Sequence, residues 1–439
     1  MEDSDIETKP TVRTLQWIRN IPSLYDILIT TKTEWPSLTC QFVPGASYDN
    51  GDLKCSILSG TQTSGQEPNV LYLTSYNCQK TVETKAERNT TTSPSKPTTD
   101  PRITVTSSLT FDGDVNKILF HPKIPSTVSI LSSSGVVNMM DYTPNFRPPS
   151  LTRTFHGLDG EGFGLSWNKV ITNRICAASV TGMVCVWSQD QQNDEPLQSF
   201  SSKIPTSCCE WNPEHGNIIA CGMDGGVCHL NDLLTSCKTP AITIALQQQS
   251  DINSISFNQH PSMSHLLLIG AENGSISLWD TRNTQRALHN FPYHTERITD
   301  LSWAPYLPPS LVSSSHAHEG SSIFVSASAD CNISLWDCEL IGQDSSADSP
   351  PKMKPPEQIF VHYGHLAPVN TVGWWPVPFP KKQTDSAPET EPSPYPYIFV
   401  STDSENGCHI WNVKQGTPPF FESQHGGRFI DINEKLGDG

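Results

Sequence analysis

Residues 325–337 read Val-Ser-Ala-Ser-Ala-Asp-Cys-Asn-Ile-Ser-Leu-Trp-Asp: a run of small residues, a polar turn, and an apolar strand that closes on Trp336 and Asp337. Other stretches of the chain close in the same way, with Trp or a substitute followed by Asp or a substitute. They are 138–141 (Asn-Met-Met-Asp), 185–188 (Cys-Val-Trp-Ser), 230–232 (Leu-Asn-Asp), 277–280 (Ser-Leu-Trp-Asp) and 409–412 (His-Ile-Trp-Asn). The closing residues of successive stretches lie 47, 44, 48, 57 and 75 positions apart. One structural unit is therefore repeated through most of the sequence.

The spacing and content of the repeats predict the fold. The three shorter intervals fit a unit of about 40–45 residues, and the two longer ones contain insertions. Each unit also carries an earlier strand with an aromatic residue, at Phe120, Trp167, Trp211, Phe257, Trp303 and Trp374. Four short strands with polar turns form one blade of a β-propeller. Six units lie between about residues 110 and 413, and residues 53–78 supply strands for a seventh. We therefore expect an all-β fold, a seven-bladed WD-repeat β-propeller with a short N-terminal helix.

Three regions are expected along the chain: an N-terminal segment over 1–34, the propeller over 35–413, and a tail over 414–439. Stretches rich in Pro, Ser and Thr, or inserted between blades, predict loops within the propeller at 81–102, 342–357 and 378–396. A short helix is predicted over 11–20, because Val12, Leu15 and Ile18 share one side of it. Alternating apolar residues predict a strand over 35–43, and we expect this strand to complete the blade that ends at Trp411 and so to close the ring.

Charge and cysteine content exclude several classes of protein. The chain has 439 residues, with 45 Asp and Glu against 28 Lys and Arg, and a formal net charge of −17. Such a balance does not suit non-specific binding to nucleic-acid phosphates and suits basic protein partners better. Thirteen cysteines, an odd number without a Cys-x-x-Cys pair, indicate reduced core thiols rather than a disulfide framework or a zinc site. No apolar run approaches the roughly 18 residues that span a membrane, and the acidic N-terminus is unlike a secretory signal.

No motif in the sequence points to catalysis. The chain has no phosphate-binding Gly-rich loop, nucleophile elbow or His-Glu-x-x-His motif, and its 14 histidines form no metal-ligand spacing with cysteine. We therefore predict that the protein is not an enzyme and uses no catalytic residue, cofactor or metal. His294, Ser328, Asp330 and Trp336 look like the buried hydrogen-bonded set found in many WD repeats. The fold by itself does not define a function.

The segment before the repeats is more specific. Residues 23–42 read Ser-Leu-Tyr-Asp-Ile-Leu-Ile-Thr-Thr-Lys-Thr-Glu-Trp-Pro-Ser-Leu-Thr-Cys-Gln-Phe. The Leu-Tyr-Asp and Glu-Trp-Pro-Ser-Leu stretches closely resemble hallmarks of the histone-binding WD-repeat family, which contains the retinoblastoma-binding proteins and the small subunit of chromatin assembly factor. Similar stretches follow in the family's order, at 112–116 (Asp-Gly-Asp-Val-Asn), 161–168 (Glu-Gly-Phe-Gly-Leu-Ser-Trp-Asn) and 277–283 (Ser-Leu-Trp-Asp-Thr-Arg-Asn). The resemblance extends from about residue 15 to residue 413.

This resemblance implies two binding surfaces. In the family, the N-terminal helix and an inserted acidic loop form a side groove for a helix of histone H4. The matching residues here are Val12, Leu15, Ile18, Ile341, Asp344 and Asp348. The second surface is the upper rim of the central channel, an acidic ring that holds the tail of histone H3 in the family. Its matching residues are Asp114, Asn116, Glu161, Phe163, Asp251 and Asn253, whereas Gln62, Ser207, Arg297, Pro368 and Ser404 depart from the family pattern.

The implied function is that of a non-catalytic histone-binding subunit, a chaperone or adaptor for histone H4 or the H3–H4 pair. Its other partners would be larger subunits of a chromatin assembly, histone acetyltransferase or deacetylase complex, without direct contact to nucleic acid or membrane. The implied location is the nucleus, with the cytoplasm left open. Two rival functions are a chaperone for a basic ribosomal protein in ribosome biogenesis, which would use the same acidic surface, and a substrate receptor of a ubiquitin ligase. The departures at the rim favour the side groove as the main site.

Overall fold

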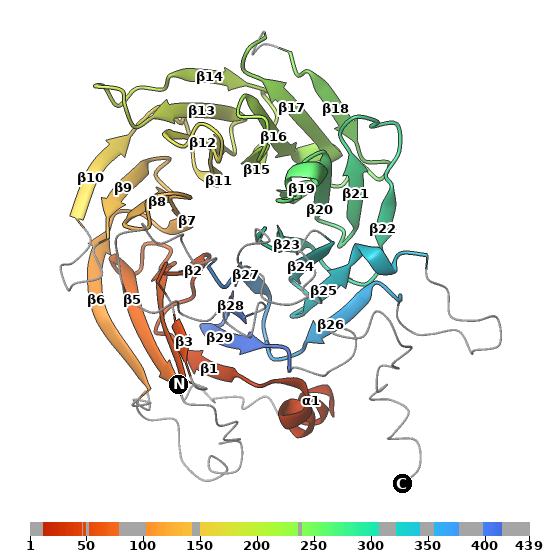
Figure 1. Ribbon diagram of the computed structural model, residues 1–439. Coiled ribbons are helices and arrows are strands. Elements are labelled where there is room, and N and C mark those ends of the chain that lie inside the picture. Colours follow the sequence, from red (N-terminus) through yellow and green to blue (C-terminus); the bar gives the residue numbers. More distant parts are fainter. Residues whose placement is uncertain are drawn as a thin grey trace, which may run out of the picture.

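Seven β-sheets stand around a central channel in the computed structural model (Figure 1). The structure describes residues 12–45, 47–49, 52–78, 102–142, 150–235, 239–306, 322–342, 355–376 and 398–414. Within these residues six sheets have four strands and one has five. The prediction of an all-β, seven-bladed propeller with one short N-terminal helix is confirmed. The expected loops and tail fall mostly outside the described residues, at 81–101, 343–354, 378–396 and 415–439.

Each blade is one antiparallel sheet, and we number the blades by the order of their innermost strands. The first blade contains β2 (Cys40–Phe42), β3 (Ser47–Asp49), β4 (Asp52–Gly60), β5 (Asn69–Cys78) and β6 (Ile103–Phe111). The second contains β7 (Val115–Phe120), β8 (Thr127–Ser132), β9 (Val137–Asp141) and β10 (Ser150–Phe155). The third contains β11 (Gly162–Trp167), β12 (Arg174–Ser179), β13 (Met183–Ser188) and β14 (Gln198–Ser201).

The remaining blades follow the same plan. The fourth contains β15 (Thr206–Trp211), β16 (Ile218–Met223), β17 (Val227–Asp232) and β18 (Ile242–Ala245). The fifth contains β19 (Ile252–Phe257), β20 (Leu266–Ala271), β21 (Ile276–Asp280) and β22 (His289–Phe291). The sixth contains β23 (Ile298–Trp303), β24 (Ile323–Ser328), β25 (Ile333–Asp337) and β26 (Gln358–His362). The seventh contains β27 (Val369–Trp374), β28 (Ile398–Asp403), β29 (Gly407–Asn412) and β1 (Leu28–Lys32).

The innermost strand of each blade lines the channel (Figure 1). Because every blade repeats the same antiparallel plan, these inner strands run in one direction and their first residues gather at one end of the channel. We call this end the upper mouth. Side chains of one inner strand accept a backbone N–H from the next, as when Ser254 Oγ accepts from Leu301 N at 2.9 Å. Glu210 and Asp300 replace the hydroxyl with a carboxylate at two such junctions, where they accept from Phe257 N at 2.7 Å and Val372 N at 3.2 Å.

The ring is closed by an N-terminal strand, but not by the one predicted. β1 pairs with β29 from Leu28 opposite Trp411 to Lys32 opposite Gly407. The Asn412 amide oxygen extends the seam, accepting from Asp26 N at 3.1 Å and Ile27 N at 2.6 Å. The predicted closing stretch, 35–43, instead supplies β2, the inner strand of the first blade. Leu38, Cys40 and Phe42 alternate with polar residues, whereas residues 28–32 (Leu-Ile-Thr-Thr-Lys) do not, so the pattern favoured the wrong stretch. The propeller begins at β1, upstream of the expected boundary at residue 35.

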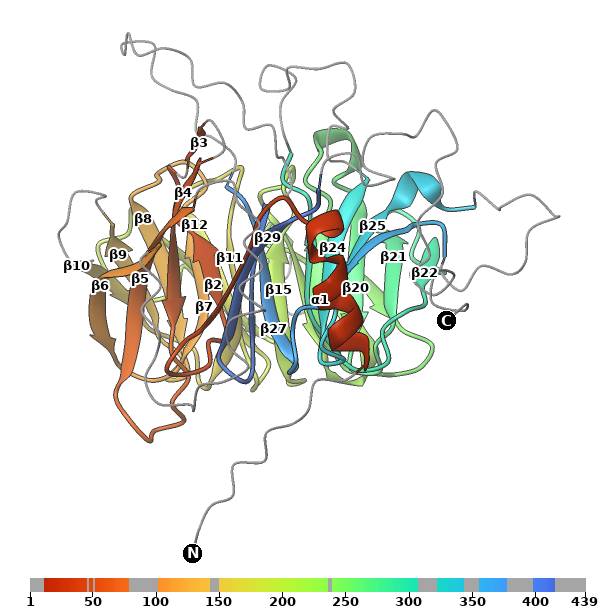
Figure 2. The ribbon, with the colours of Figure 1, turned by 90° about the horizontal axis from the view of Figure 1, so that it is seen from below.

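Helix α1 (Val12–Leu24) precedes β1 and is longer than the predicted helix over 11–20. It stands along the outer wall of the ring (Figure 2). One apolar cluster buries two side chains of the helix, Trp17 and Ile21, and also Tyr25, which directly follows the helix. The cluster includes side chains of the sixth and seventh blades, among them Phe360 and Trp411. This tertiary packing explains the extra turn, because a helix of this length is marginal on its own.

Candidate functional site

A buried hydrogen-bonded set lies in the sixth blade, as predicted, but with a different serine. His294 Nδ1 lies 2.9 Å from Asp330 Oδ2, and His294 Nε2 lies 2.8 Å from Ser326 Oγ. The Trp336 indole N–H donates to the same Ser326 Oγ at 2.9 Å. The prediction that placed Ser328 in this set was wrong: its hydroxyl donates to a backbone carbonyl. Ser326 and Ser328 lie two residues apart in β24 and share one face of the strand, so sequence spacing could not separate them.

The seventh blade repeats the set, which sequence analysis missed. His365 Nδ1 lies 2.7 Å from Asp403 Oδ2, and its Nε2 lies 2.7 Å from Ser401 Oγ, which accepts the Trp411 N–H at 3.2 Å. Burial raises the pKa of Asp403, but the hydrogen bond and charge of His365 and two backbone N–H groups outweigh it, so the pKa falls below its ordinary value. Both nitrogens of this histidine are committed to the set, which suits a structural role rather than proton transfer.

A chain of polar contacts ties α1 to the last blade. The Trp17 indole N–H donates to the Tyr25 hydroxyl at 3.0 Å, and this oxygen lies 2.8 Å from His362 Nδ1. His362 Nε2 lies 3.1 Å from His409 Nδ1. We call these four residues the α1 seam. Burial lowers the pKa of His362 and of His409 well below the ordinary value, so both imidazoles are neutral at pH 7.

Three imidazoles come close together at this place, those of His362, His365 and His409. The rings of His365 and His409 are stacked, with centroids 4.0 Å apart and planes 12° from parallel. Imidazole lone pairs lie in the ring plane, so stacked rings direct them side by side rather than toward one ion. His362 and His365 also use both of their nitrogens in hydrogen bonds. The cluster therefore reads as packing of the seam rather than as a metal centre.

The predicted rim residues gather at the upper mouth of a channel of about 800 Å³. Asn116, Phe163 and Asn253 line this channel. The Asn116 amide N–H donates to Glu161 Oε1 at 2.9 Å, which joins the second and third blades. Phe163 keeps 38% of its surface exposed, unusual for an aromatic side chain in this core. The structure thus places these residues of three neighbouring or nearby blades around one opening.

The rim acids share a feature that the sequence did not reveal: one carboxylate oxygen of each is held by the scaffold. Asp251 Oδ1 accepts from Gly225 N at 2.6 Å, and Asp114 Oδ1 accepts from Thr63 N at 3.0 Å. Glu272, which sequence analysis missed, lines the channel and accepts from the Asn253 amide at 2.7 Å. The second oxygen of each acid accepts no hydrogen bond from the described residues. Each carboxylate is therefore oriented and still able to bind a ligand cation.

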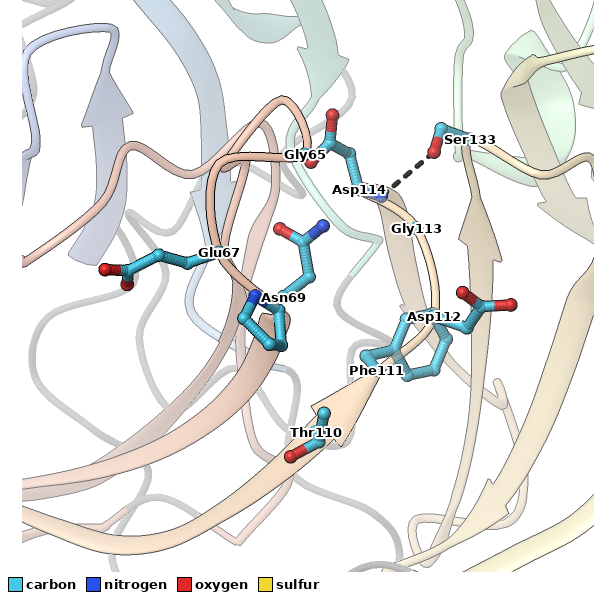
Figure 3. Close-up of a pocket in the computed structure, with 10 residues that line it drawn as sticks. Gly65, Glu67, Asn69, Thr110, Phe111, Asp112, Gly113, Asp114 and Ser133 are labelled. Atoms are coloured by element: carbon cyan, nitrogen blue, oxygen red, sulfur yellow. Dashed lines mark hydrogen bonds between the residues drawn. The ribbon is translucent and has the colours of Figure 1, made fainter.

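Asp114 also borders a shallow pocket of about 600 Å³ between the first and second blades (Figure 3). Its backbone N–H donates to Ser133 Oγ at 2.9 Å, which fixes the turn that carries it. Figure 3 shows Glu67 and Asp112 on opposite sides of the pocket, with their carboxylates pointing away from each other. The Glu67 carboxylate accepts the Trp35 indole N–H at 3.1 Å. The pocket is consequently not a closed acidic cage, despite its three acidic residues.

Deeper in the channel, charged side chains reach across the lumen. Lys117 Nζ, from the second blade, lies 3.8 Å from Asp300 Oδ1 of the sixth. Lys169 of the third blade contacts the Gln259 amide oxygen of the fifth. Burial raises the pKa of Glu210, in the fourth blade, to about 7, although the nearby Lys169 charge offsets part of the shift. The lumen is thus crossed by the chain's own side chains below the upper mouth.

The predicted side-groove residues lie partly within the described structure. Leu15 is 46% exposed on α1, and Ile18 is half-buried against the cluster that also receives Leu340. Ile341 is half-buried too, but it packs on the neighbouring cluster between the fifth and sixth blades. Nothing is described for the side chain of Val12, and Asp344 and Asp348 lie outside the described residues.

The acid at the end of the predicted loop 342–357 is paired within the scaffold. Glu357 is buried, and its Oε1 lies 2.8 Å from His289 Nε2 of the fifth blade. This contact ties the end of the insertion to the outer strand β22. It also removes the Glu357 carboxylate from the charges available to a ligand.

No helix among the described residues is long and apolar enough to cross a membrane.

Comparison with known proteins agrees with this geometry. Residues 13–78 match the family model of "Histone-binding protein RBBP4" and its counterpart in the CAF1 complex, and residues 241–280 match the "WD domain, G-beta repeat" model. The chain is 24% identical to "Histone-binding protein MSI1" of Saccharomyces cerevisiae over an alignment of 457 positions, gaps included, covering 93% of this chain and 95% of that protein. It is 25% identical to "Histone acetyltransferase type B subunit 2" of Debaryomyces hansenii over 373 residues, covering 82% and 84%.

The fold defines the class of the protein as a WD-repeat β-propeller. It has seven sheets around a channel, a ring closed by an N-terminal strand, and two buried His-Ser-Asp-Trp sets. The matched stretch 13–78 contains α1, the closing strand β1 and the Leu-Tyr-Asp and Glu-Trp-Pro-Ser-Leu signatures. The chain is similar to the histone-binding WD-repeat family in this stretch, and to the two named relatives over most of its length.

Proposed function

We propose that this protein is a non-catalytic histone-binding subunit that holds a helix of histone H4 in a groove beside α1. The observation that carries the proposal is the match of residues 13–78 to the histone-binding family model, because these residues form α1 and the strand that anchors it. The relatives are named as a histone-binding protein and as acetyltransferase type B subunits. The same role here makes the protein an adaptor for H4 or the H3–H4 pair.

The exposed stripe of α1 suits a helical ligand. Trp17 and Ile21 face the propeller, whereas Leu15, Ile18 and Pro22 follow an i, i+3, i+7 spacing beside them. Leu15 and Pro22 are exposed, and Ile18 is only half-buried. An amphipathic helix presents anchors at the same spacing when it lies in an apolar groove. The stripe and Leu340 supply the apolar side of such a groove, and the acids expected at Asp344 and Asp348 would meet a basic ligand.

The charge of the whole chain favours the same partner. A net charge of −17 attracts basic proteins over a distance of several ångströms and speeds their encounter. Histones are such proteins, and the subunit would present them to larger subunits of a chromatin assembly or acetyltransferase complex in the nucleus. The two rival functions, a ribosomal-protein chaperone and a ubiquitin-ligase receptor, gain no support from the named relatives.

A titration with a labelled peptide of the first H4 helix tests the proposal. Replacing both Leu15 and Ile18 by Ala removes apolar contact worth about 1–3 kcal/mol for each side chain that the ligand buries. Affinity should fall roughly tenfold for each 1.4 kcal/mol lost. Leu234→Ala is the matched control, since Leu234 is an equally apolar and more exposed side chain on the fourth blade. Equal binding by the double variant and the control would place the H4 site elsewhere, and no binding by the native chain would refute the function.

A further inference from the structure

The upper mouth contains one cation that the scaffold leaves free. Arg297 directly precedes β23, is exposed, and lines the channel. Its guanidinium makes no salt bridge or hydrogen bond with the described residues. The rim acids differ, because each has one oxygen held by a backbone or amide N–H. Arg297 therefore has its full hydrogen-bonding capacity available to a ligand.

A second polar group follows in the sequence. Thr299, in strand β23 and two residues after Arg297, also lines the channel, and its hydroxyl is buried without a hydrogen-bond partner among the described residues. A buried hydroxyl without a partner is costly and needs an explanation, such as a ligand group that completes it. Together, the Arg297 fork of N–H donors and a free hydroxyl donor are the groups that bind a tetrahedral oxyanion.

The acid in strand β23, Asp300, does not cancel this site. Asp300 follows Thr299, but its Oδ2 accepts from the Thr371 hydroxyl at 2.7 Å and from Val372 N. Its Oδ1 faces Lys117 Nζ at 3.8 Å. The Asp300 charge is thus compensated within the lumen. Glu272, on the neighbouring blade, keeps its second oxygen free and remains available for a cation of the same ligand.

We propose that Arg297 and Thr299 form a phosphate subsite, and that the upper mouth binds a Lys- and Arg-rich peptide carrying a phosphorylated serine or threonine. The phosphate takes the Arg297 fork, and basic side chains of the peptide meet the free oxygens of Glu161, Asp251 and Glu272. The inference rests on the proposed function in one respect, that the partner is a basic, histone-like tail. At the position of Arg297 the rim would prefer an anion to a cation, because Arg297 repels the basic side chains of an unmodified tail.

A fluorescence anisotropy titration tests the subsite with two labelled peptides. Both have the same Lys- and Arg-rich sequence around a central serine, which is phosphorylated in only one of them. Native protein should bind the phosphorylated peptide about ten- to a hundredfold more tightly, as expected for one charge-assisted contact. Arg297→Ala should abolish the difference, and Thr299→Val should reduce it severalfold. Arg297→Glu should reverse it, because the new carboxylate attracts the unmodified tail.

Arg282→Ala is the matched control, since Arg282 is an exposed arginine whose only charged partner is Asp280, outside the lining of the channel. This variant should keep the native preference. Equal affinity of native protein for the two peptides, or an undiminished preference in Arg297→Ala, would overturn the inference. The H4-helix titration of native protein separates the two proposals. Binding of the H4 peptide without a phosphate preference refutes only the subsite, and a phosphate preference without H4 binding refutes only the proposed function.

Discussion

The α1 seam and the channel both enclose titratable side chains, but acid acts on them in opposite directions. In the seam, burial keeps His362 and His409 neutral and lowers their pKa values well below 6.5. In the channel, burial raises the pKa of Glu210 from 4.5 to about 7. The seam also pairs its polar groups with one another, whereas the upper mouth leaves one oxygen of each acid free. The α1 seam holds the ring together, and the upper mouth of the channel has carboxylate oxygens available to bind a ligand.

The pH dependence follows from these two shifts. An unfolded histidine takes up a proton near pH 6.5 while His362 and His409 resist it, so the seam's contribution to stability is full above pH 6.5 and is lost as the pH falls toward their lowered pKa values. Glu210 behaves in the opposite way. Its protonated form favours folding, so this contribution is full below pH 4.5 and is lost as the pH rises through about 7. The two regions thus limit stability from opposite sides of neutrality.

Removing the seam altogether should have the largest effect. Deletion of residues 1–33 removes α1 and β1, exposes the edge of β29 and uncovers the apolar cluster around Trp411. An unpaired edge of this kind promotes aggregation. We expect aggregated protein without a cooperative thermal transition, measured by size-exclusion chromatography and calorimetry. Deletion of residues 1–11, which precede α1, is the control. A soluble, cooperatively melting monomer from the larger deletion would show that the ring does not depend on β1.

A single hydroxyl tests the seam more finely. Tyr25→Phe keeps the ring but leaves the Trp17 indole N–H and His362 Nδ1 without their partner. A buried group left unpaired costs about 1–3 kcal/mol, so we expect the free energy of unfolding to fall by about 2 kcal/mol. Urea denaturation at pH 7.5 measures it. Tyr142→Phe is the control, because the Tyr142 side chain is largely buried but its hydroxyl makes no hydrogen bond with the described residues. Equal losses in both variants would mean that the hydrogen-bonded chain adds nothing.

The smallest expected effect lies in the channel. Glu210→Gln keeps an oxygen that can accept from Phe257 N but removes the buried charge. The variant should gain about 1 kcal/mol over native protein at pH 8, since a raised pKa reflects a destabilised charged form, and lose that advantage near pH 5. Denaturation at the two pH values measures the difference. The exposed Glu214 provides the control variant Glu214→Gln. A gain that does not depend on pH would assign the effect to packing rather than to charge.

The fold was predictable because repeated Trp-Asp strands are separated by nearly constant intervals, and each such strand must lie in an equivalent place. The closing strand was not, because residues 28–32 lack the apolar alternation that marks residues 38–42, and only the three-dimensional position of β29 selects them. The same limit applies to Ser326 and Ser328, which lie on one face of β24. Local pattern identifies a face of a strand, and tertiary contact decides which residue of that face makes the bond.

The family signature proposes the candidate site residues, but it does not predict their hydrogen bonding. Asn116 and Glu161 stand 45 positions apart, and no spacing rule predicts that the amide holds the carboxylate. Glu272 was missed because its Ala-Glu-Asn-Gly turn looks like any polar turn between two strands. Glu357 ends the predicted loop 342–357, and its pairing with His289 depends on how the end of the insertion returns to the sixth blade. Long-range polar pairs of this kind are fixed by the assembled blades.

The pairing of β1 with β29 also has a consequence for biosynthesis. Leu28 is made early and its partner Trp411 late, so the ring cannot close on the ribosome until nearly the whole chain has emerged. At about 5–20 residues per second, β1 and the apolar face of α1 wait roughly 20–80 s for their partners. During that time β1 has no strand to pair with, and the apolar face of α1 has no blade to pack against. A cell that makes this protein therefore has to shield its first forty residues, and this interval, rather than the finished ring, is when the chain is most exposed to misassembly.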